Sequence, residues 1–236
     1  MSRRPRDGEK ARKSAFALAA KRGFDVVFSA AVLVVFGPLF GVAAALIKLG
    51  SPGPVFFRQE RVGRDGKPFF IYKFRTMVSD APALGPGITA AGDPRVTRVG
   101  HLLRVTKLDE LPNFVNVLGG EMSVVGPRPD LPRFMTTLTA EQRRLLDFRP
   151  GITGPTQIRY IAEEEMLSPV NIDDNYVENV LRDKIVSDLD YVTRWNLGRD
   201  VLFILYTVVA LVFKLMGRMT RTFRLTRATP RRDAAS

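Results

Sequence analysis

A run of 22 residues without a formal charge, from Val26 to Ile47, constrains the fold of this chain more than any other feature. The run is long enough for a membrane helix, which needs about 20 apolar residues. It is also too long, and begins too late, for a cleaved signal peptide. Gly37 and Pro38 lie at its centre. Because proline removes a helix hydrogen bond and clashes with the preceding turn, we expect a kink at this point.

Basic residues stand on both sides of the apolar run. Lys21 and Arg22 precede it, and Lys48 and several arginines follow it. Lys and Arg are retained on the cytoplasmic side of a membrane, so both ends of the run are expected on that side. A re-entrant helix over residues 24–49, which breaks at Gly37 and Pro38 and returns, meets this condition. A kinked span with an external catalytic domain is the rival interpretation.

The positive charge of the chain is concentrated in its two tails. The net charge is +12, and residues 1–23 and 214–236 each contribute +6, so the sequence between them sums to zero. A nucleic-acid-binding fold would be expected to carry basic residues on its folded surface. Basic tails beside apolar segments instead favour the anionic cytoplasmic face of a membrane, and we expect no nucleic-acid partner. The absence of cysteine excludes disulfides and thiolate metal sites.

A second apolar run, Val201–Phe213, has 13 residues and ends at Lys214. This length is too short to span a bilayer. Two interpretations remain, a core helix and an interfacial amphipathic helix near 199–213. The basic tail that follows favours the interfacial helix, because such a tail can bind anionic headgroups.

The region between the two apolar runs has the pattern of a small α/β, helix-rich domain, residues 50–213. Two aromatic-rich segments, Val55–Glu60 and Phe69–Phe74, are typical of strands, and Arg64–Lys67 between them has the composition of a hairpin turn. Thr139 is placed to cap a helix in a capping box with Gln142. Apolar periodicity predicts further helices over 99–105, 108–118 and 179–195.

The segment Lys107–Asn113 carries the adjacent carboxylates Asp109 and Glu110, close to Arg104. Carboxylates in a basic neighbourhood are expected to stay ionised. Magnesium usually takes one or two carboxylates together with substrate phosphates, and an aspartate can also attack phosphorus as a nucleophile. The alternative is that both residues are merely charges on the first turn and polar side of the predicted helix 108–118.

Two other segments carry cations suited to phosphate. Lys73 and Arg75 alternate along a predicted strand and are expected on one face, although a solvated strand edge would look the same. Arg128 lies between Pro127 and Pro129, which fix the backbone around a guanidinium that suits phosphate. The alternative there is a structural turn with a surface arginine.

Several stretches, taken together and in order, resemble the bacterial monotopic phosphoglycosyl transferases, also called bacterial sugar transferases. No single stretch is decisive, but the ordered set is specific. The chain departs from the family at Gly37, where serine is frequent, at Lys107, where serine or threonine is frequent, and after Gly154. It resembles the small form of the family, without a multi-span N-terminal domain. The matching stretches are Lys21–Asp25, Ser51–Phe57, Lys73–Met77, Leu108–Pro112, Met122–Pro129 and Arg149–Gly154.

The resemblance implies a transferase that moves a phosphosugar from a nucleotide diphosphate sugar, usually a UDP-sugar, to polyprenyl phosphate. This is the first membrane step of exopolysaccharide or glycoconjugate assembly. In the family the aspartate, here Asp109, is the nucleophile that forms a covalent aspartyl intermediate, and Glu110 assists at the magnesium site. The loop Pro127–Pro129 contacts the nucleotide. The membrane helix is re-entrant, and the catalytic domain faces the cytoplasm at the bacterial inner membrane.

Two alternative functions are a magnesium-dependent nucleotide-sugar hydrolase and a non-catalytic membrane adaptor in which the dyad is structural. The sequence leaves open whether the protein forms a homo-oligomer. On the transferase interpretation, Mg²⁺ neutralises the diphosphate and the cationic side chains stabilise its oxygens. The predicted substrate-binding residues are Lys73, Arg75, Arg104, Pro127, Arg128, Pro129, Arg149 and Arg159.

Overall fold

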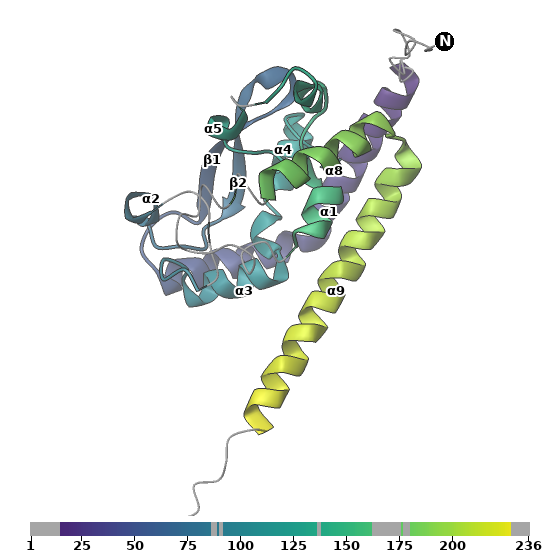
Figure 1. Ribbon diagram of the computed structural model, residues 1–236. Helices are drawn as coiled ribbons and strands as arrows, with labels where there is room; N and C mark the ends of the chain where they lie inside the picture. The colour runs from purple at the N-terminus through teal and green to yellow at the C-terminus, as the bar shows by residue number, and fades with distance from the viewer. Residues whose placement is uncertain are drawn as a thin grey trace, which may run out of the picture.

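The computed structural model describes residues 15–85, 89, 92–135, 138–161, 176 and 180–227, and for residues 15, 16, 82 and 218–227 the backbone alone. The predicted basic tails lie partly outside these residues. Within them, short helices and two small sheets form a rounded body, and the long helices α1 and α9 run along and beyond it (Figure 1). The helix-rich α/β prediction is therefore confirmed.

The chain alternates short strands with helices and 3₁₀ turns. In order, the elements are α1 (Ala15–Gly50), β1 (Phe56–Val62), η1 (Arg64–Gly66), β2 (Pro68–Phe74), α2 (Ala81–Leu84), α3 (Arg98–Thr106), η2 (Leu108–Glu110), α4 (Asn113–Gly119), β3 (Ser123–Val125), α5 (Pro132–Met135), η3 (Gln142–Asp147), β4 (Gly151–Thr153), α6 (Pro155–Arg159), α8 (Arg182–Thr193) and α9 (Leu197–Arg227).

The predicted hairpin is confirmed. Strands β1 and β2 pair antiparallel, with Phe56 opposite Phe74 and Val62 opposite Pro68. Helix α4 docks beside β2 through Asn116, whose Nδ2 donates to the Phe70 carbonyl at 2.7 Å and whose Oδ1 accepts from the Tyr72 amide at 3.1 Å. This buried asparagine satisfies backbone groups that β1 leaves unpaired, so it fixes α4 against the hairpin.

Strands β3 and β4 form a second, parallel pair in the core of the domain. Val124 and Val125 are buried there. Gly126 and Gly151 lie so close that a Cβ atom on either would collide with the backbone of the other segment. The chain leaves β3 through this narrow point into the loop Pro127–Pro129.

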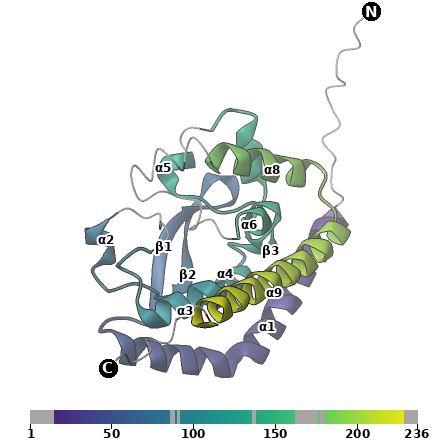
Figure 2. The ribbon, with the colours of Figure 1, turned by 60° about the horizontal axis from the view of Figure 1, so that its bottom comes forward.

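Helix α1 is longer than the predicted 24–49 segment and is continuous through Gly37 and Pro38. Figure 2 shows that it changes direction along its length and curves beneath the domain. Many of its apolar side chains are exposed, among them Val34 and Val35 at 78% and 70%. It is long and apolar enough to cross a membrane. The bend agrees with the proline, whereas a re-entrant path stays a prediction.

Helix α9 corrects the prediction of a short helix near 199–213. The helix continues past Lys214, and Leu197–Gly217 is long and apolar enough to cross a membrane. Sequence reasoning ended the segment at the lysine because of its charge. In the structure Lys214 Nζ donates to the Ile161 carbonyl at 2.7 Å, and α9 continues through this residue. Figure 1 shows α9 extending beyond the body of the domain.

A buried ion pair ties the two long helices to β3. Lys21 on α1 donates to Asp200 Oδ2 on α9 at 2.7 Å and to the Val125 carbonyl at 3.0 Å. Tyr191 and Trp195 also donate to Asp200. Because removing one partner of a buried pair is strongly unfavourable, this junction holds both helices at one end of the domain.

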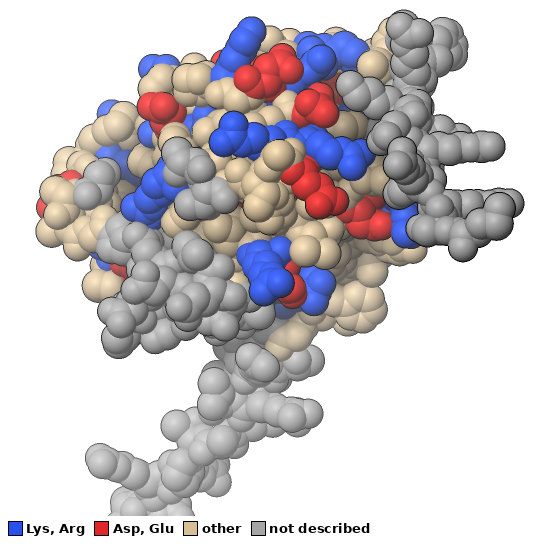
Figure 3. All heavy atoms as spheres, turned by 45° about the horizontal axis from the view of Figure 1, so that its top comes forward, with Lys and Arg blue, Asp and Glu red and all other residues tan. Residues whose placement is uncertain are grey.

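The folded part carries a mixed surface. Lys and Arg are interspersed with Asp and Glu over the face drawn in Figure 3. This pattern agrees with the zero net charge of residues 24–213.

Candidate active site

The dyad Asp109 and Glu110 lies in the separate 3₁₀ turn η2, between α3 and α4. The sequence predicted these residues on the first turn of one helix over 108–118. The structure differs because Lys107 adopts a left-handed conformation (φ 59°, ψ 16°) and Pro112 precedes α4, which begins at Asn113. Proline has no amide proton and is best tolerated at a helix start. The dyad is therefore held on a short turn between two helices.

Asp109 is buried, and its Oδ1 has no hydrogen-bond partner among the described residues. Burial raises the pKa of the Asp109 carboxyl to about 6, with the Lys73 charge acting against the rise and the Glu110 charge adding to it. Desolvation outweighs the nearby cations in setting the direction of this shift, but a pKa of about 6 still leaves Asp109 mostly ionised near neutral pH, as the sequence predicted.

Glu110 has the opposite character. Its Oε1 lies 2.7 Å from Lys73 Nζ and 3.8 Å from Arg128 Nη2. Burial opposes its ionisation, but the charges of Lys73, Arg128 and Lys107 together hold the pKa of Glu110 below its usual range. In the dyad the pKa of Glu110 is therefore lowered, whereas that of Asp109 is raised towards neutrality. Carboxyl pairs with pKa values shifted in opposite directions are typical of catalytic sites.

Arg128, which the sequence predicted as a phosphate-binding residue, reaches the dyad from the loop after β3. Its backbone amide donates to Asp188 Oδ2 at 2.9 Å, and Thr156 Oγ1 donates to the other oxygen of Asp188. Burial raises the pKa of Asp188 to about 7. Asp188 was missed by sequence reasoning, although its place between Ile185 and Tyr191 on an apolar stripe was a usable signal.

A cavity of about 990 Å³ opens at the dyad. Its size is that of a pocket for a small organic ligand. The cavity contains the dyad, aromatic side chains and residues of α9, namely Thr207, Leu211 and Lys214. The Lys and Arg residues that line it are Arg61, Lys73, Arg75, Arg95, Arg98, Arg104, Lys107, Arg128, Lys184 and Lys214.

Arg75 lines the cavity but is largely used by the protein itself. Its guanidinium donates to the Ser51 carbonyl at 2.8 Å, to Ser51 Oγ at 3.0 Å and to the Pro52 carbonyl at 2.5 Å. It therefore pins the turn between α1 and β1. Arg104 also lines the cavity and donates to Thr76 Oγ1 at 2.8 Å.

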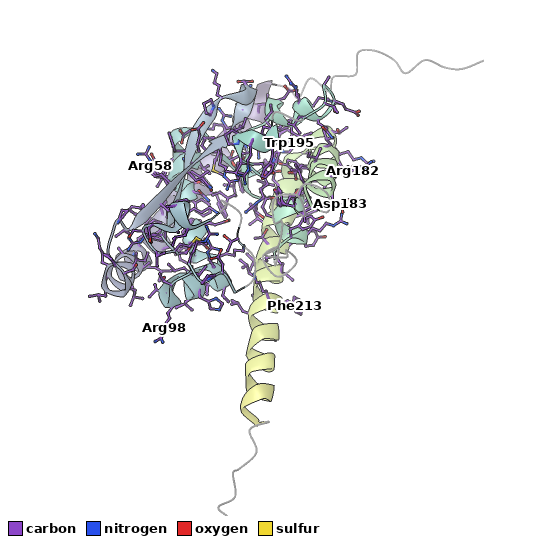
Figure 4. The ribbon with its side chains drawn as sticks, turned by 60° about the vertical axis from the view of Figure 1, so that its left-hand side comes forward. Arg58, Arg98, Arg182, Asp183, Trp195 and Phe213 are labelled. Atoms are coloured by element: carbon purple, nitrogen blue, oxygen red, sulfur yellow. The ribbon has the colours of Figure 1, made fainter. Side chains whose placement is uncertain are left out.

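The other predicted substrate-binding residues lie outside the lining of this cavity. Pro127, Pro129, Arg149 and Arg159 do not line the cavity formed by the described residues. Arg149 donates to the Gly120 carbonyl at 2.7 Å. Arg159 lies 3.1 Å from Asp183, which Figure 4 shows at the outer surface of the domain. The sequence suggested Arg149 and Arg159 because they lie in or near a turn-rich loop, but neither lines the cavity of the described residues.

The two carboxylates are compatible with a magnesium ion. Among the described residues no group of three or more His, Asp or Glu is placed to hold a metal. Magnesium does not require such a group, since one or two carboxylates with substrate phosphates suffice. The buried Asp109 Oδ1, which has no hydrogen-bond partner among the described residues and lies next to Glu110 in the chain, is suited to be a ligand of such an ion.

Comparison with known proteins matches this chain to one family over most of its length. A family model described as bacterial sugar transferase matches residues 16–214. A UDP-glucose:undecaprenyl-phosphate glucose-1-phosphate transferase of Caulobacter vibrioides is 41% identical over 197 residues, covering 81% of this chain and 69% of that protein. A UDP-N-acetylgalactosamine-undecaprenyl-phosphate N-acetylgalactosaminephosphotransferase of Aeromonas hydrophila is 40% identical, with 80% and 42% covered.

A shorter relative is matched over nearly its whole length. The exopolysaccharide production protein PSS of Rhizobium leguminosarum bv. phaseoli is 39% identical over 200 residues, with 82% of this chain and 95% of that protein covered. The chain thus spans less than half of the Aeromonas protein but almost all of the Rhizobium one.

Proposed function

This chain belongs to the bacterial sugar transferases, and from that premise we propose that it transfers a phosphosugar from a UDP-sugar to a polyprenyl phosphate and releases UMP. The names of its relatives describe UDP-sugar donors and undecaprenyl-phosphate acceptors. The observation that carries the proposal is the dyad of buried Asp109 and partly buried Glu110 at a cation-lined cavity that the apolar helix α9 also lines.

In the proposed reaction, a carboxylate oxygen of Asp109 attacks the phosphorus that bears the sugar. The bond from this phosphorus to the oxygen bridging to UMP breaks, and UMP leaves with the electron pair. A phosphate oxygen of the polyprenyl phosphate then attacks the same phosphorus, and the Asp109 carboxylate is released. The covalent aspartyl intermediate allows the two substrates to react in turn.

In this scheme Glu110, Lys73 and Arg128 position the donor and balance the charge of its phosphates. Glu110 holds both cations at the dyad through Oε1. Phosphoryl transfer depends mainly on positioning and charge stabilisation, which such a cluster provides. Asp109 and Glu110 would hold Mg²⁺ together with the donor diphosphate, and the ion would neutralise the diphosphate charge.

We further propose that α1 enters the bacterial inner membrane from the cytoplasm and returns, with residues 50–213 as a cytoplasmic catalytic domain. The support is the bend of α1 and the basic residues at both of its ends. Single cysteines introduced by Ser14→Cys and Lys67→Cys test it, because the chain has no native cysteine. An impermeant thiol reagent is expected to label both from the same side, and labelling from opposite sides would establish a span.

The test of the activity is UMP release across a panel of UDP-sugars, with and without undecaprenyl phosphate and Mg²⁺. Release that requires lipid, metal and Asp109 supports the transferase and identifies its sugar. Sustained release without lipid would instead establish a nucleotide-sugar hydrolase. If no nucleoside monophosphate is released from any UDP-sugar or from sugars of other nucleotides, the non-catalytic adaptor is the remaining interpretation.

A further inference from the structure

We propose that α9 forms the wall of the cavity on which the acceptor lipid docks. The phosphate would lie beside Lys214, and the polyprenyl chain would leave along α9 into the bilayer. The proposal rests on the proposed function and assigns its acceptor half to a particular surface.

One narrow stripe of α9 faces the domain. Phe203, Thr207, Leu211 and Lys214 are half-buried and recur at spacings of three and four residues. This spacing places them on one side of a helix. Thr207 Oγ1 lies 2.5 Å from Thr153 Oγ1 on β4, so the stripe is fixed to the core sheet.

Between Val201 and Met216, most of the other side chains of α9 are apolar and exposed. Exposed fractions include 55% for Leu205, 50% for Val209 and 68% for Phe213. Exposure of such side chains to water costs about 25 cal/mol per Å² of apolar surface. A lipid environment removes this cost, and α9 has the length and composition to enter one.

The same helix reaches the cavity of the dyad. Thr207, Leu211 and Lys214 line the cavity that also contains Asp109 and Glu110. Ile152, Tyr160 and Ile161 line it too, and Lys214 donates to the Ile161 carbonyl. Figure 4 shows Phe213, the neighbour of Lys214, where α9 leaves the body of the domain. One face of α9 is therefore suited to lipid, while its other face belongs to the active-site cavity.

The chemistry of this wall selects the acceptor over the donor. A UDP-sugar is polar along its whole length and fits the clustered charges of Lys73, Arg128 and Glu110. A polyprenyl phosphate has one anionic group at the end of a long hydrocarbon chain. The α9 wall offers the matching pair, one ammonium at Lys214 next to Leu211 and a continuous apolar helix surface.

The first test is the variant Lys214→Gln, in which the amide can still donate to the Ile161 carbonyl. The KM for undecaprenyl phosphate is expected to rise about tenfold, the scale of one lost hydrogen bond to a charged group, while the KM for the UDP-sugar stays unchanged. Lys214→Arg should recover most of the acceptor affinity. Arg199→Gln, which removes one charge from the same helix outside the cavity lining, is the matched control and should leave both KM values unchanged.

Measurements on the donor step and on the acceptor step distinguish a failure of this proposal from a failure of the proposed function. If the wild-type protein shows no lipid-dependent UMP release, the transferase itself fails. If the wild type is active, an unchanged acceptor KM in Lys214→Gln, or an equal rise in both KM values, overturns the docking wall. The single burst of UMP formed without acceptor is expected to be unaltered in the variant.

A second measurement does not depend on a variant. A photoreactive polyprenyl phosphate is expected to crosslink to residues 207–214 of the wild-type protein. Unlabelled undecaprenyl phosphate should suppress this crosslink, whereas an equal amount of phosphatidylglycerol should not. Equal suppression by both lipids would show only general lipid contact and would overturn the proposal.

Discussion

Asp109 and Asp188 are both buried carboxyl groups, and they differ in whether their oxygens have hydrogen-bond partners. Asp109 faces the cavity with Oδ1 unpartnered among the described residues. Asp188 lies behind the loop, with the Arg128 amide on one oxygen and the Thr156 hydroxyl on the other. Burial raises the pKa of both carboxyls. A raised pKa alone therefore does not mark a catalytic group, and the proposed role of Asp109 rests on its unpartnered oxygen at the cavity.

The largest effect is expected at Asp109. Asp109→Asn removes the proposed nucleophile but keeps the shape of a side chain whose charge is unfavourable where it lies. UMP release should fall by about 10³-fold or more, while the free energy of unfolding changes by less than about 1 kcal/mol. Activity assays and denaturant unfolding of the same preparation check both. A large loss of stability would show that Asp109 is structural.

Glu110→Gln should lower both activity and stability. The variant leaves Lys73 without its anionic partner at a site where the Lys73 side chain is only 20% exposed. Breaking such a partly buried pair costs about 2–4 kcal/mol in the free energy of unfolding. The double variant Lys73→Met with Glu110→Gln is the matched control, and it should recover most of the stability but none of the activity. Equal stability of the single and double variants would show that the ion pair contributes nothing.

Substitutions of Asp188 should change the free energy of unfolding and its dependence on pH. Asp188→Ala leaves the Arg128 amide without its acceptor and should cost about 1–3 kcal/mol in the free energy of unfolding. Asp188→Asn can accept from that amide and donate to Thr156, so at pH 5 it should be markedly more stable than the alanine variant. Both are measured by denaturant unfolding.

The sign of the pH effect follows from the raised pKa of Asp188. The protonated form is favoured in the folded state, so its contribution is full below about pH 4, the unfolded value, and is lost as pH rises towards about 7. The stability of Asp188→Asn relative to wild type should therefore increase between pH 4 and 7, by on the order of a few kcal/mol. A difference that is constant with pH would show that Asp188 is ionised throughout.

Local patterns allowed much of the fold to be predicted. The two aromatic-rich segments and the turn composition between them predicted the pairing of β1 and β2. Thr139 and Gln142 form the two hydrogen bonds of the expected capping box before η3, at 3.3 Å from Thr139 Oγ1 to the Gln142 amide and 2.8 Å from the Thr139 amide to Gln142 Oε1. The family resemblance is confirmed over residues 16–214. These features depend on neighbours within a few residues or on an ordered set of short motifs.

The environment of the dyad could not be predicted in the same way. Lys73 comes to Glu110 across 37 residues, and Asp188 comes to the Arg128 amide across 60. The net pKa of Asp109 depends on how burial compares with several charges, and burial is a property of the packed domain. The length of the apolar helix α9 was underestimated because Lys214 was assumed to end it, whereas Lys214 lies half-buried against the domain within the helix.

The smallest effect is expected at Arg159, which the sequence suggested as a substrate-binding residue and which lies outside the cavity lining of the described residues. Arg159 forms an ion pair with Asp183 in which both side chains are more than half exposed. Exposed pairs contribute about 0–1 kcal/mol, so Arg159→Gln should leave stability and UMP release within error of the wild type. Arg128→Gln is the matched comparison, since it removes the guanidinium beside Glu110 and should lower UMP release strongly. Equal losses in the two variants would mean that Arg159 reaches the substrate in the working enzyme, and the lining of the cavity would then have to extend along α6 from Gln157 to Arg159.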